Sequence, residues 1–358
     1  MAMNRAFWRG KNVFLTGHTG FKGGWLALWL LDMGAKVHGY ALAPPTVPSL
    51  FSACGFHTDL ESNTISDILD VESLTNAVRR AGPEIIFHMA AQPLVRQGYS
   101  QPLETFSVNV MGTAHVLEAA RQAGKLKAVV NVTTDKCYEN REWVWPYREN
   151  EPLGGFDPYS SSKACSELVT AAYRQSFLGP AGVQVATARA GNVIGGGDWA
   201  KDRLIPDFLR SMDAGTPISV RSPGAIRPWQ HVLEPLAGYL ALAEKLFTGD
   251  PQYAESWNFG PDESDARTVQ EIVEYLCKLV PGSKWNCNPD QQMHEAHYLK
   301  LDSSKARMNL RWRPRWNLWT ALDRTLGWHH SWKQGANMRS LTQMQIHEYE
   351  RNSGPIPA

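Results

Sequence analysis

The first half of the chain alternates short apolar runs with longer amphipathic stretches. Runs such as NVFLTG (12–17) are typical of buried strands, and stretches such as GGWLALWLLDMG (23–34) are typical of helices. The pattern predicts further strands at 35–42, 84–91, 127–134 and 182–191, and further helices at 71–82, 103–124 and 161–177. Because parallel strands need crossover connections, we expect an α/β fold with a Rossmann-type doubly wound parallel sheet.

Charge and cysteine usage exclude several classes of protein. The 36 basic and 35 acidic residues nearly cancel, so no global field attracts nucleic acid or anionic lipid. The longest apolar run, WLALWLL (25–31), is too short to span a bilayer, and the first twenty residues lack a signal-peptide pattern. The five cysteines form no CxxC pair and no metal-ligand spacing. We therefore expect reduced thiols, no metal site and a cytoplasmic location.

The stretch TGHTGFKGG places glycines three residues apart, directly after the first predicted strand and at the start of the first helix. These glycines are Gly17, Gly20 and Gly23. Glycines there allow a tight turn and a close approach of the backbone to a pyrophosphate at the helix N-terminus. By itself the triplet also fits an ordinary tight turn, but its position in a βαβ unit predicts dinucleotide binding.

The kind of dinucleotide is less well determined. Residues 37–42 (VHGYAL) lack the acidic residue expected to bind the ribose of NAD, which leaves the choice between NAD and NADP open. There is also no nearby arginine to hold the 2′-phosphate of NADP, which favours NAD. Asp67 is a candidate for the adenine amino group, although a loop carboxylate or a helix N-cap would explain it too. The other residues expected to line the cofactor are Phe21, Ile68, Ala90, Ala91, Gln92 and Asn109, with Tyr159 and Lys163 described below.

The alternation stops near residue 192, where glycine- and proline-rich stretches such as GGGDW and RSPGAIRPWQ begin. We expect the dinucleotide-binding domain at 1–191. Residues 233–260, with a helix at 234–247 and a strand at 256–260, should return to its sheet. A smaller, mixed α/β C-terminal substrate domain should be built from 192–232 and 261–340.

DPYSSSKACSE places Tyr159 and Lys163 four residues apart, so the start of a helix would bring both to one face. An ammonium beside a phenol favours the phenolate, so we expect Lys163 to lower the pKa of Tyr159 from about 10. Such a phenolate can remove an alcohol proton while hydride leaves the same carbon for a nicotinamide. Alone, YxxxK would fit two exposed helix residues. Behind a dinucleotide loop and a strand-end Thr134, it predicts an oxidoreductase step.

These motifs resemble the extended short-chain dehydrogenase/reductase family, over nearly the whole length of the chain. RAGNVIGGGDW, IRPWQHV and WNFGP stand where nucleotide-sugar-modifying members hold their substrate, and LDSSKARMNLRWRPRW is similar to the C-terminal signature. GHTGFKGGWL, HMAAQPLVR and TTDKCYEN are most similar to members that dehydrate CDP-glucose. The resemblance therefore implies a 4,6-dehydratase that uses NAD and acts on CDP-glucose in deoxysugar biosynthesis, such as that of lipopolysaccharide O-antigen.

The same resemblance implies a role for each residue that follows the predicted strand at 127–134. Tyr159, with Thr134 and Lys163, would oxidise the sugar at C4, and Asp135 would protonate the C6 hydroxyl as it leaves. Lys136 stands where many relatives have a glutamate that removes the C5 proton. It would act as the base if its pKa were lowered, or would remain charged and stabilise the enolate.

The resemblance also supplies the expected substrate contacts. Arg203 and Arg227 would bind the two phosphates, and Asn192 would bind the sugar or the diphosphate. His297 and Tyr298 would make further phosphate or base contacts. Surface charges and turn residues would explain the same positions without a substrate. The predicted roles of the remaining polar residues are structural for His88 and His231, and packing or sugar contact for Tyr138.

Two other functions and an assembly remain open at this point. A 4-epimerase or decarboxylase acting on a UDP-sugar would share Tyr159 and Lys163 but would not need Asp135 and Lys136 to eliminate water. A dinucleotide-sensing regulator without chemistry would tolerate loss of Tyr159 or Lys163, and both are present. The resemblance implies a homodimer or homotetramer formed through helices 103–123 and 161–177, whose sequence would also suit buried core helices.

Overall fold

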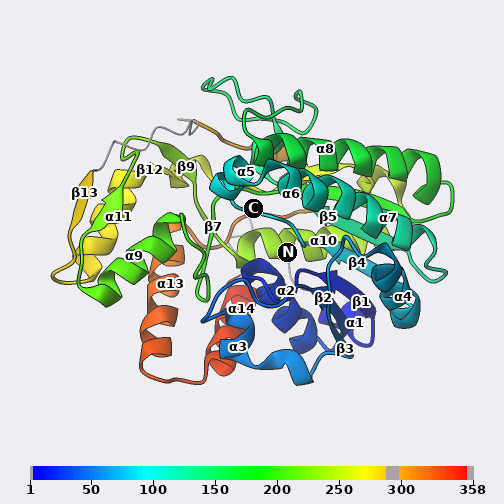
Figure 1. Ribbon diagram of the computed structural model, residues 1–358, viewed down its shortest axis with the longest axis horizontal. Helices are drawn as coiled ribbons and strands as arrows, with labels where there is room; N and C mark the ends of the chain where they lie inside the picture. Colours follow the sequence, from blue (N-terminus) through cyan, green and yellow to red (C-terminus); the bar gives the residue numbers. More distant parts are fainter. Residues whose placement is uncertain (1–2, 288–297, 353–358) are drawn as a thin grey trace.

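The computed structural model describes residues 3–287 and 298–352, and its centre is a parallel sheet of seven strands (Figure 1). The strand order is β11-β6-β5-β4-β1-β2-β3, and every neighbouring pair is parallel. The strands are β1 (Asn12–Thr16), β2 (Lys36–Ala41), β3 (Ser62–Ile65), β4 (Ile85–His88), β5 (Ala128–Val132), β6 (Gln184–Arg189) and β11 (Ser256–Asn258). The predicted α/β class and doubly wound sheet are confirmed.

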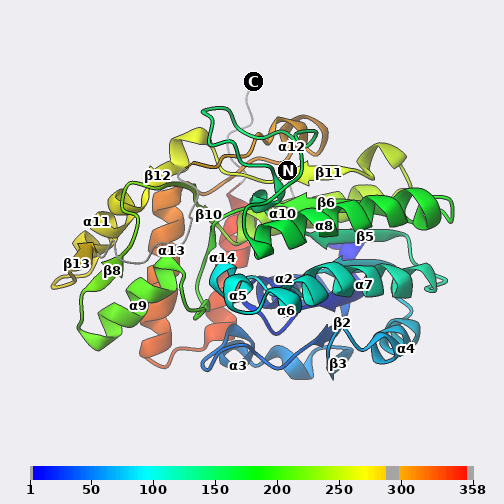
Figure 2. The same cartoon turned by 45° about the horizontal axis from the view of Figure 1, so that its top comes forward.

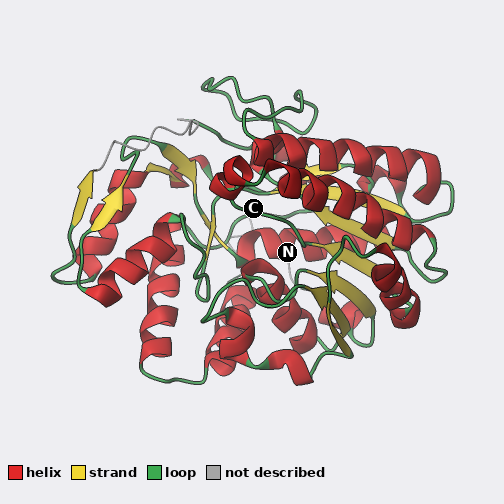
Figure 3. Ribbon diagram, in the orientation of Figure 1, coloured by secondary structure: helices red, strands yellow, loops and turns green. Residues whose placement is uncertain are grey.

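Helices cover both faces of this sheet, which Figure 3 shows as yellow strands between red helices. One face packs on α2 (Phe21–Asp32), α10 (Leu233–Phe247) and α14 (Met338–Arg351), and the other on α4 (Val71–Ala81) and α7 (Gly112–Arg121). Neighbouring residues of one strand face opposite layers: Val13 and Leu15 join the first core, and Phe14 joins the second. The continuous apolar runs of the sequence follow from this burial on both faces.

The predicted helix at 103–124 is a composite. It consists of α6 (Pro102–Phe106), a π-helical turn at Ser107–Met111 and α7, after a short α5 (Val95–Ser100). The predicted helix at 161–177 begins earlier, as α8 (Pro158–Tyr173), because Asp157 caps its first turn and Pro158 occupies its first position. It ends in a second π-helical turn, Arg174–Leu178. Figure 2 shows α8 beside β6, and α5, α6 and α7 along the same side of the sheet.

A smaller unit with its own apolar core lies beside the sheet, on the left of Figure 1. Its helices are α9 (Leu204–Ala214), α11 (Val269–Leu279) and α13 (Leu318–Lys333). Three two-stranded sheets accompany them: β7 (Val193–Ile194) with β10 (Gln230–His231), β8 (Ile218–Val220) with β13 (Trp285–Cys287), and β9 (Ile226–Pro228) with β12 (Ala266–Thr268). This unit contains both helices and strands, as the sequence predicted.

The end of the chain returns to the large domain. Before this segment, α12 (Ser304–Asn309) packs on β11. The remaining short helices are α1 (Arg5–Trp8) and α3 (Leu50–Cys54). The 3₁₀ turns are Phe56–Thr58, Asp135–Cys137, Pro251–Tyr253 and Glu263–Asp265. α14 packs on α2 and α3, and Trp29 Nε1 donates to Glu350 at 2.7 Å. The domain boundaries remain a prediction. Among the described residues, none of the helices has the length and apolar character required to cross a membrane.

The chain order of the strands reverses between β1 and β4. From β1 the next strands in sequence, β2 and β3, extend to one side, and β4, β5 and β6 extend to the other. In open α/β sheets, ligands bind outside the carboxyl ends of the strands at such a switch point. The residues predicted to bind a cofactor follow β1 and β4, so they meet at this edge.

Candidate active site

The glycine-rich turn between β1 and α2 has the geometry that a pyrophosphate requires. Gly17 has a left-handed φ of 79°, and a β-carbon there would lie 2.8 Å from the Ala90 backbone nitrogen. Gly20 caps α2, and its N–H donates to the Gly17 carbonyl at 3.1 Å. A β-carbon on Gly23 would overlap the Gly17 carbonyl. The backbone therefore packs closely around a free helix N-terminus, which suits a dinucleotide phosphate.

Neutral groups lie beside β2, where an adenosine ribose would be expected. The His18 ring is fully buried, contacts Gly39 closely and hydrogen-bonds Asn63 Oδ1 through Nε2 at 2.8 Å. Burial lowers the pKa of His18, so the ring is uncharged. Neutral hydrogen-bonding groups fit an unphosphorylated ribose better than a 2′-phosphate, which agrees with the preference for NAD.

The predicted adenine contacts have partners within the protein. Asp67 Oδ1 accepts the Leu69 N–H at 2.9 Å, and its backbone carbonyl accepts the Tyr40 hydroxyl at 2.9 Å. The helix N-cap that we considered for Asp67 is instead Asp70. Ile68 is buried, and a β-carbon on Gly112 would overlap its side chain. The structure thus places Asp67 and Ile68 together in the loop after β3.

The loop after β4 is held by an amide pair. Asn109, in the π-helical turn, accepts the Gln92 N–H at 2.9 Å and donates to the Gln92 carbonyl at 3.1 Å. The Gln92 side chain donates to Thr105 and Leu94, so it is engaged within the loop. Ala90 is half-buried, and its N–H donates to Thr16 Oγ1 at 3.1 Å. Gln92 and Asn109 therefore fix the loop that carries Ala90 and Ala91 at the cofactor edge.

Three of the five predicted catalytic side chains lie at the 3₁₀ turn that follows β5. Thr134 caps this turn: its Oγ1 accepts the Lys136 N–H at 3.3 Å and donates to Asp135 Oδ1 at 3.0 Å. Asp135 is 2% exposed, and its Oδ2 is buried without a hydrogen-bond partner in the described part of the chain. Lys136 is half-buried. Thr134, Asp135 and Lys136 therefore occupy one short turn at the carboxyl edge of the sheet.

Tyr159 and Lys163 lie on α8 and are both buried beside this turn. The Lys163 ammonium donates to the Val132 carbonyl, at the end of β5, at 3.0 Å. Burial is the main cause that lowers the pKa of Lys163, to about 8. The structure therefore brings the strand end and the YxxxK helix together as the sequence predicted.

The expected pKa of Tyr159 was wrong. Burial raises it to about 12, and the charges of Asp135 and Asp157 act in the same direction. A hydrogen bond from Thr134 and the charge of Arg203 lower it, but they do not compensate for the loss of hydration. The extent of this burial cannot be read from the sequence, and Lys163 donates to the Val132 carbonyl.

Lys22 and Tyr239 are site residues that the sequence reasoning missed. Lys22 Nζ donates to the Tyr239 hydroxyl at 3.1 Å and lies 5.2 Å from the centre of its ring. Burial lowers the pKa of Lys22 to about 7, with Lys163 and Arg203 acting in the same direction and Asp135 opposing them. A lysine inside the glycine-rich turn was the available signal for Lys22. Nothing local marked Tyr239, which lies on α10.

The predicted substrate residues are distributed over the smaller unit. Arg203 precedes α9 and pairs with Asp198 at 2.9 Å, and its charge reaches Tyr159. Asn192 is half-buried and has a left-handed φ of 38°. Arg227 lies on β9 opposite Arg267 of β12. Arg203 is thus a predicted phosphate ligand that the structure places near Tyr159, a predicted catalytic residue.

Of the two remaining predicted contacts, the structure describes Tyr298, in the segment that lies along the loop after the Asp135–Cys137 turn. Tyr298 is half-buried, and its carbonyl accepts a hydrogen bond from Asn140 at 3.1 Å. His297 lies outside the described residues.

Three other polar side chains are structural. His88 and His231 are buried and uncharged, since burial lowers the pKa of each to about 3. The Tyr138 hydroxyl donates to Asn258 and accepts from Arg189, so Tyr138 is a packing residue.

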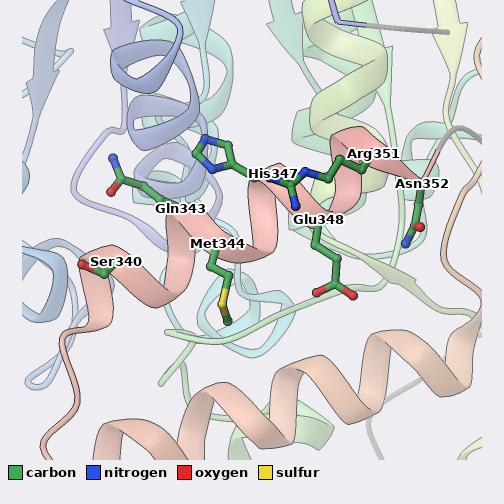
Figure 4. Close-up of a pocket in the computed structure, with 7 residues that line it drawn as sticks. All are labelled: Ser340, Gln343, Met344, His347, Glu348, Arg351 and Asn352. Atoms are coloured by element: carbon green, nitrogen blue, oxygen red, sulfur yellow. The ribbon is translucent and has the colours of Figure 1, made fainter.

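A separate surface hollow lies away from these residues, along α14 (Figure 4). Its lining is formed by Ser340, Gln343, Met344, His347, Glu348, Arg351 and Asn352. α14 supplies all of these side chains except that of Asn352, which directly follows the helix, and none belongs to the predicted site. All five cysteines are free, and the described residues contain no cluster of metal-ligating side chains.

Known proteins are similar to this chain in sequence and in fold. Residues 14–325 match the family of GDP-mannose 4,6 dehydratase. The chain is 56% identical to a CDP-glucose 4,6-dehydratase of Salmonella typhimurium, over 97% of this chain and 98% of the relative. It is 25% identical to a dTDP-glucose 4,6-dehydratase of Xanthomonas campestris, over 90% and 94%.

Two solved structures are similar at lower identity. A dTDP-glucose 4,6-dehydratase from Streptomyces venezuelae, solved with NAD, has a TM-score of 0.75 and 24% identity, covering 90% of this chain and 98% of that one. A UDP-glucose 4-epimerase from Thermotoga maritima has a TM-score of 0.74 and 21% identity, covering 90% and 99%. The fold is therefore common to dehydratases and epimerases.

Fold and site together define an extended short-chain dehydrogenase/reductase, with a dinucleotide turn after β1 and a Tyr–Lys pair on α8. Within that class, the chain belongs to the GDP-mannose 4,6 dehydratase family.

Proposed function

We propose that this protein is an NAD-dependent CDP-glucose 4,6-dehydratase, which converts CDP-glucose to CDP-4-keto-6-deoxy-glucose. The observation that carries the reaction type is the turn Thr134–Asp135–Lys136 beside Tyr159, because an acid and a second ionisable group next to a dehydrogenase pair suit the removal of water. The observation that carries the substrate is 56% identity to a CDP-glucose 4,6-dehydratase.

Oxidised NAD, when bound, supplies a hydride acceptor for the sugar C4 position and later the hydride donor for C6. The residues that would hold it are the turn Gly17–Gly23, the loop with Asp67 and Ile68, and the edge at Ala90 and Ala91. The free N–H groups at the start of α2 would orient the pyrophosphate.

Tyr159 would take the proton of the C4 hydroxyl. Thr134 and Arg203 favour its phenolate, because each lowers the pKa of the phenol against the effect of burial. Lys163 would stay close as a cation, held by the Val132 carbonyl. In this role the buried pair excludes water and aligns the C4 hydroxyl for oxidation.

Lys136 and Asp135 would act once C4 is a ketone, which acidifies the C5 proton. Lys136 would remove that proton, and Asp135 would give a proton to the C6 hydroxyl so that it departs as water. When hydride returns to C6, Lys136 would give its proton back to C5. Asp135 Oδ2 is buried and makes no hydrogen bond within the described residues, so the protein does not use its hydrogen-bonding capacity. Arg203, Arg227 and Asn192 are the proposed diphosphate and sugar ligands. Tyr298 and His297 are proposed to contact the phosphate or the nucleotide base.

The assembly is proposed as a homodimer, or a pair of such dimers, through the two helical stretches at 103–123 and 161–177. They carry exposed apolar side chains, namely Leu103, Met111, Leu168 and Phe177. The opposite side of α7 is buried in the sheet, so only one side is available to a partner. Light scattering would give the oligomer size. The cytoplasm remains the proposed location, since all five cysteines are free.

The test is to incubate the purified protein with CDP-glucose, UDP-glucose, dTDP-glucose or GDP-mannose, with and without NAD, and to weigh the products by mass spectrometry. Loss of one water from CDP-glucose alone is the expected result. Water loss from another sugar nucleotide would keep the reaction and reject the substrate. Isomerisation without water loss, which leaves the mass unchanged and is detected by chromatography of the same samples, would favour the epimerase. Tyr159→Phe is the matched inactive control.

A further inference from the structure

A third ionisable side chain lies on the same face of α8 as Tyr159 and Lys163. Glu167 follows Lys163 by four residues, as Lys163 follows Tyr159, which places the three in a row along the helix. Glu167 is 3% exposed. The proposed chemistry uses the first two side chains and leaves the third without a role.

The Glu167 carboxylate is surrounded by donors. Arg189, on β6, makes a bidentate pair with it, Nε to Oε1 at 2.9 Å and Nη2 to Oε2 at 2.8 Å. Three hydroxyls also donate to it, those of Thr133, Thr187 and Ser256. Burial alone would raise the pKa of Glu167, but Arg189 and the hydroxyls hold it below its usual value. The group is therefore a fixed anion within the core.

This ion pair holds the catalytic turn from both ends. On one side Thr133, which donates to Glu167, is the residue directly before Thr134. On the other side Arg189 Nη1 donates to the Tyr138 hydroxyl at 2.8 Å, and Tyr138 directly follows the Asp135–Cys137 turn. Arg189 Nη1 also donates to the Glu149 carbonyl at 3.0 Å.

We propose that Glu167, paired with Arg189, is a positioning residue that fixes the turn carrying Thr134, Asp135 and Lys136 relative to the helix carrying Tyr159 and Lys163. The inference rests on the proposed function, since it assigns the precision of that same site to a buried ion pair. A buried charge pair is a costly way to stabilise a core, but each partner is strongly oriented by its hydrogen bonds.

Glu167 has an electrostatic effect on Lys163 as well. Burial lowers the pKa of Lys163, and the negative charge of Glu167 opposes that change. The other titratable groups that face Lys163 are Cys137 on the turn, Lys22 on α2 and His88 on β4. Removing the carboxylate would leave Arg189 unpaired. The loss of the negative charge and the unpaired positive charge would both lower the pKa of Lys163. Its ammonium would therefore lose its proton at lower pH.

The test compares Glu167→Gln, Thr133→Val and a control, Ser256→Ala, which removes a Glu167 hydrogen bond away from the turn. We expect kcat for CDP-glucose to fall about 100-fold in Glu167→Gln and about 10-fold in Thr133→Val, with KM nearly unchanged. Ser256→Ala should resemble the wild type. The alkaline limb of the pH–rate profile should move to lower pH in Glu167→Gln alone, which a loss of stability would not cause.

A second readout does not depend on activity. Hydrogen exchange of residues 131–147, followed by mass spectrometry, should be faster in Thr133→Val and in Tyr138→Phe than in the wild type or in Ser256→Ala. These two variants keep the charge pair, so they remain informative if Glu167→Gln does not fold. Wild-type kcat and wild-type exchange in both would overturn the positioning role.

The outcomes also separate the two proposals. An unchanged pH profile in folded Glu167→Gln would overturn the electrostatic effect. If the wild type removed no water from CDP-glucose, the proposed function would fail, and the exchange rates would still decide the positioning role.

Discussion

The Asp135 carboxylate lies directly against the backbone of Gly191, so that a β-carbon at position 191 would overlap Oδ2. Asp135 follows β5 and Gly191 follows the neighbouring strand, β6, and the close approach leaves Asp135 only 2% exposed. The glycine of RAGNV is therefore required for space.

Gly191→Ala should displace the proposed acid and lower kcat by about 100-fold, because small misplacements of a catalytic group cost this much. Steady-state kinetics with CDP-glucose would measure it. Gly327→Ala on α13 is the matched control, since a β-carbon there meets no atom within 4 Å. Equal rates for the two variants would show that the position of Asp135 is not critical.

Lys136 can be assigned by two substitutions. If Lys136 removes the C5 proton, Lys136→Met and Lys136→Arg should both lose about 100-fold or more in kcat, because arginine keeps the charge but does not accept a proton. Mass spectrometry of the product formed in D₂O would report deuterium at C5. An active Lys136→Arg would instead assign the lysine to electrostatic stabilisation of the enolate.

Arg203 should affect both binding and the pH profile. Arg203→Met removes a proposed phosphate ligand, so KM for CDP-glucose should rise about tenfold or more. It also removes a charge that lowers the pKa of Tyr159, so that pKa should rise and the acidic limb should move to higher pH. Arg210→Met is the control and should change neither: Arg210 lies on α9, the helix that Arg203 precedes, but it hydrogen-bonds the Trp199 carbonyl and pairs with Asp207.

Glu234 should make stability depend on pH. It is fully buried, and burial raises its pKa from 4.5 to about 7, against hydrogen bonds from Tyr349, Trp316 and Arg315. A raised folded-state pKa means that its contribution is complete below pH 4.5 and is lost as pH rises through 7. The loss should be about 3 kcal/mol in the free energy of unfolding.

Urea unfolding between pH 4.5 and 8 would test this expectation. The wild type should lose stability across the interval relative to Glu234→Gln, which is less stable at low pH but does not titrate. Glu72→Gln, on the exposed first turn of α4, should follow the wild type. Parallel curves for wild type and Glu234→Gln would contradict the raised pKa.

The parallel sheet, the dinucleotide-binding turn and the order of the candidate catalytic residues along the chain could be predicted from the sequence. Strand and helix periods depend on local burial, and the alternation left few topologies for the first half of the chain. Thr134, Asp135 and Lys136 are adjacent in the chain, and Tyr159 and Lys163 are one helical turn apart. The closeness of the residues within each group therefore follows from local structure. For the same reason the helix starts were misplaced only by a few residues, where caps such as Asp157 decide the boundary.

The residues from distant parts of the chain that surround these side chains, and the pKa values that result, depend on the tertiary structure. Lys22 meets Tyr239, Arg203 reaches Tyr159, and Glu167 pairs with Arg189, although nothing in the local sequence links the members of each pair. The pKa of Tyr159 shows the reason. Desolvation depends on everything packed around a side chain, and a neighbouring charge acts through distance in space, so neither can be obtained from spacing along the chain.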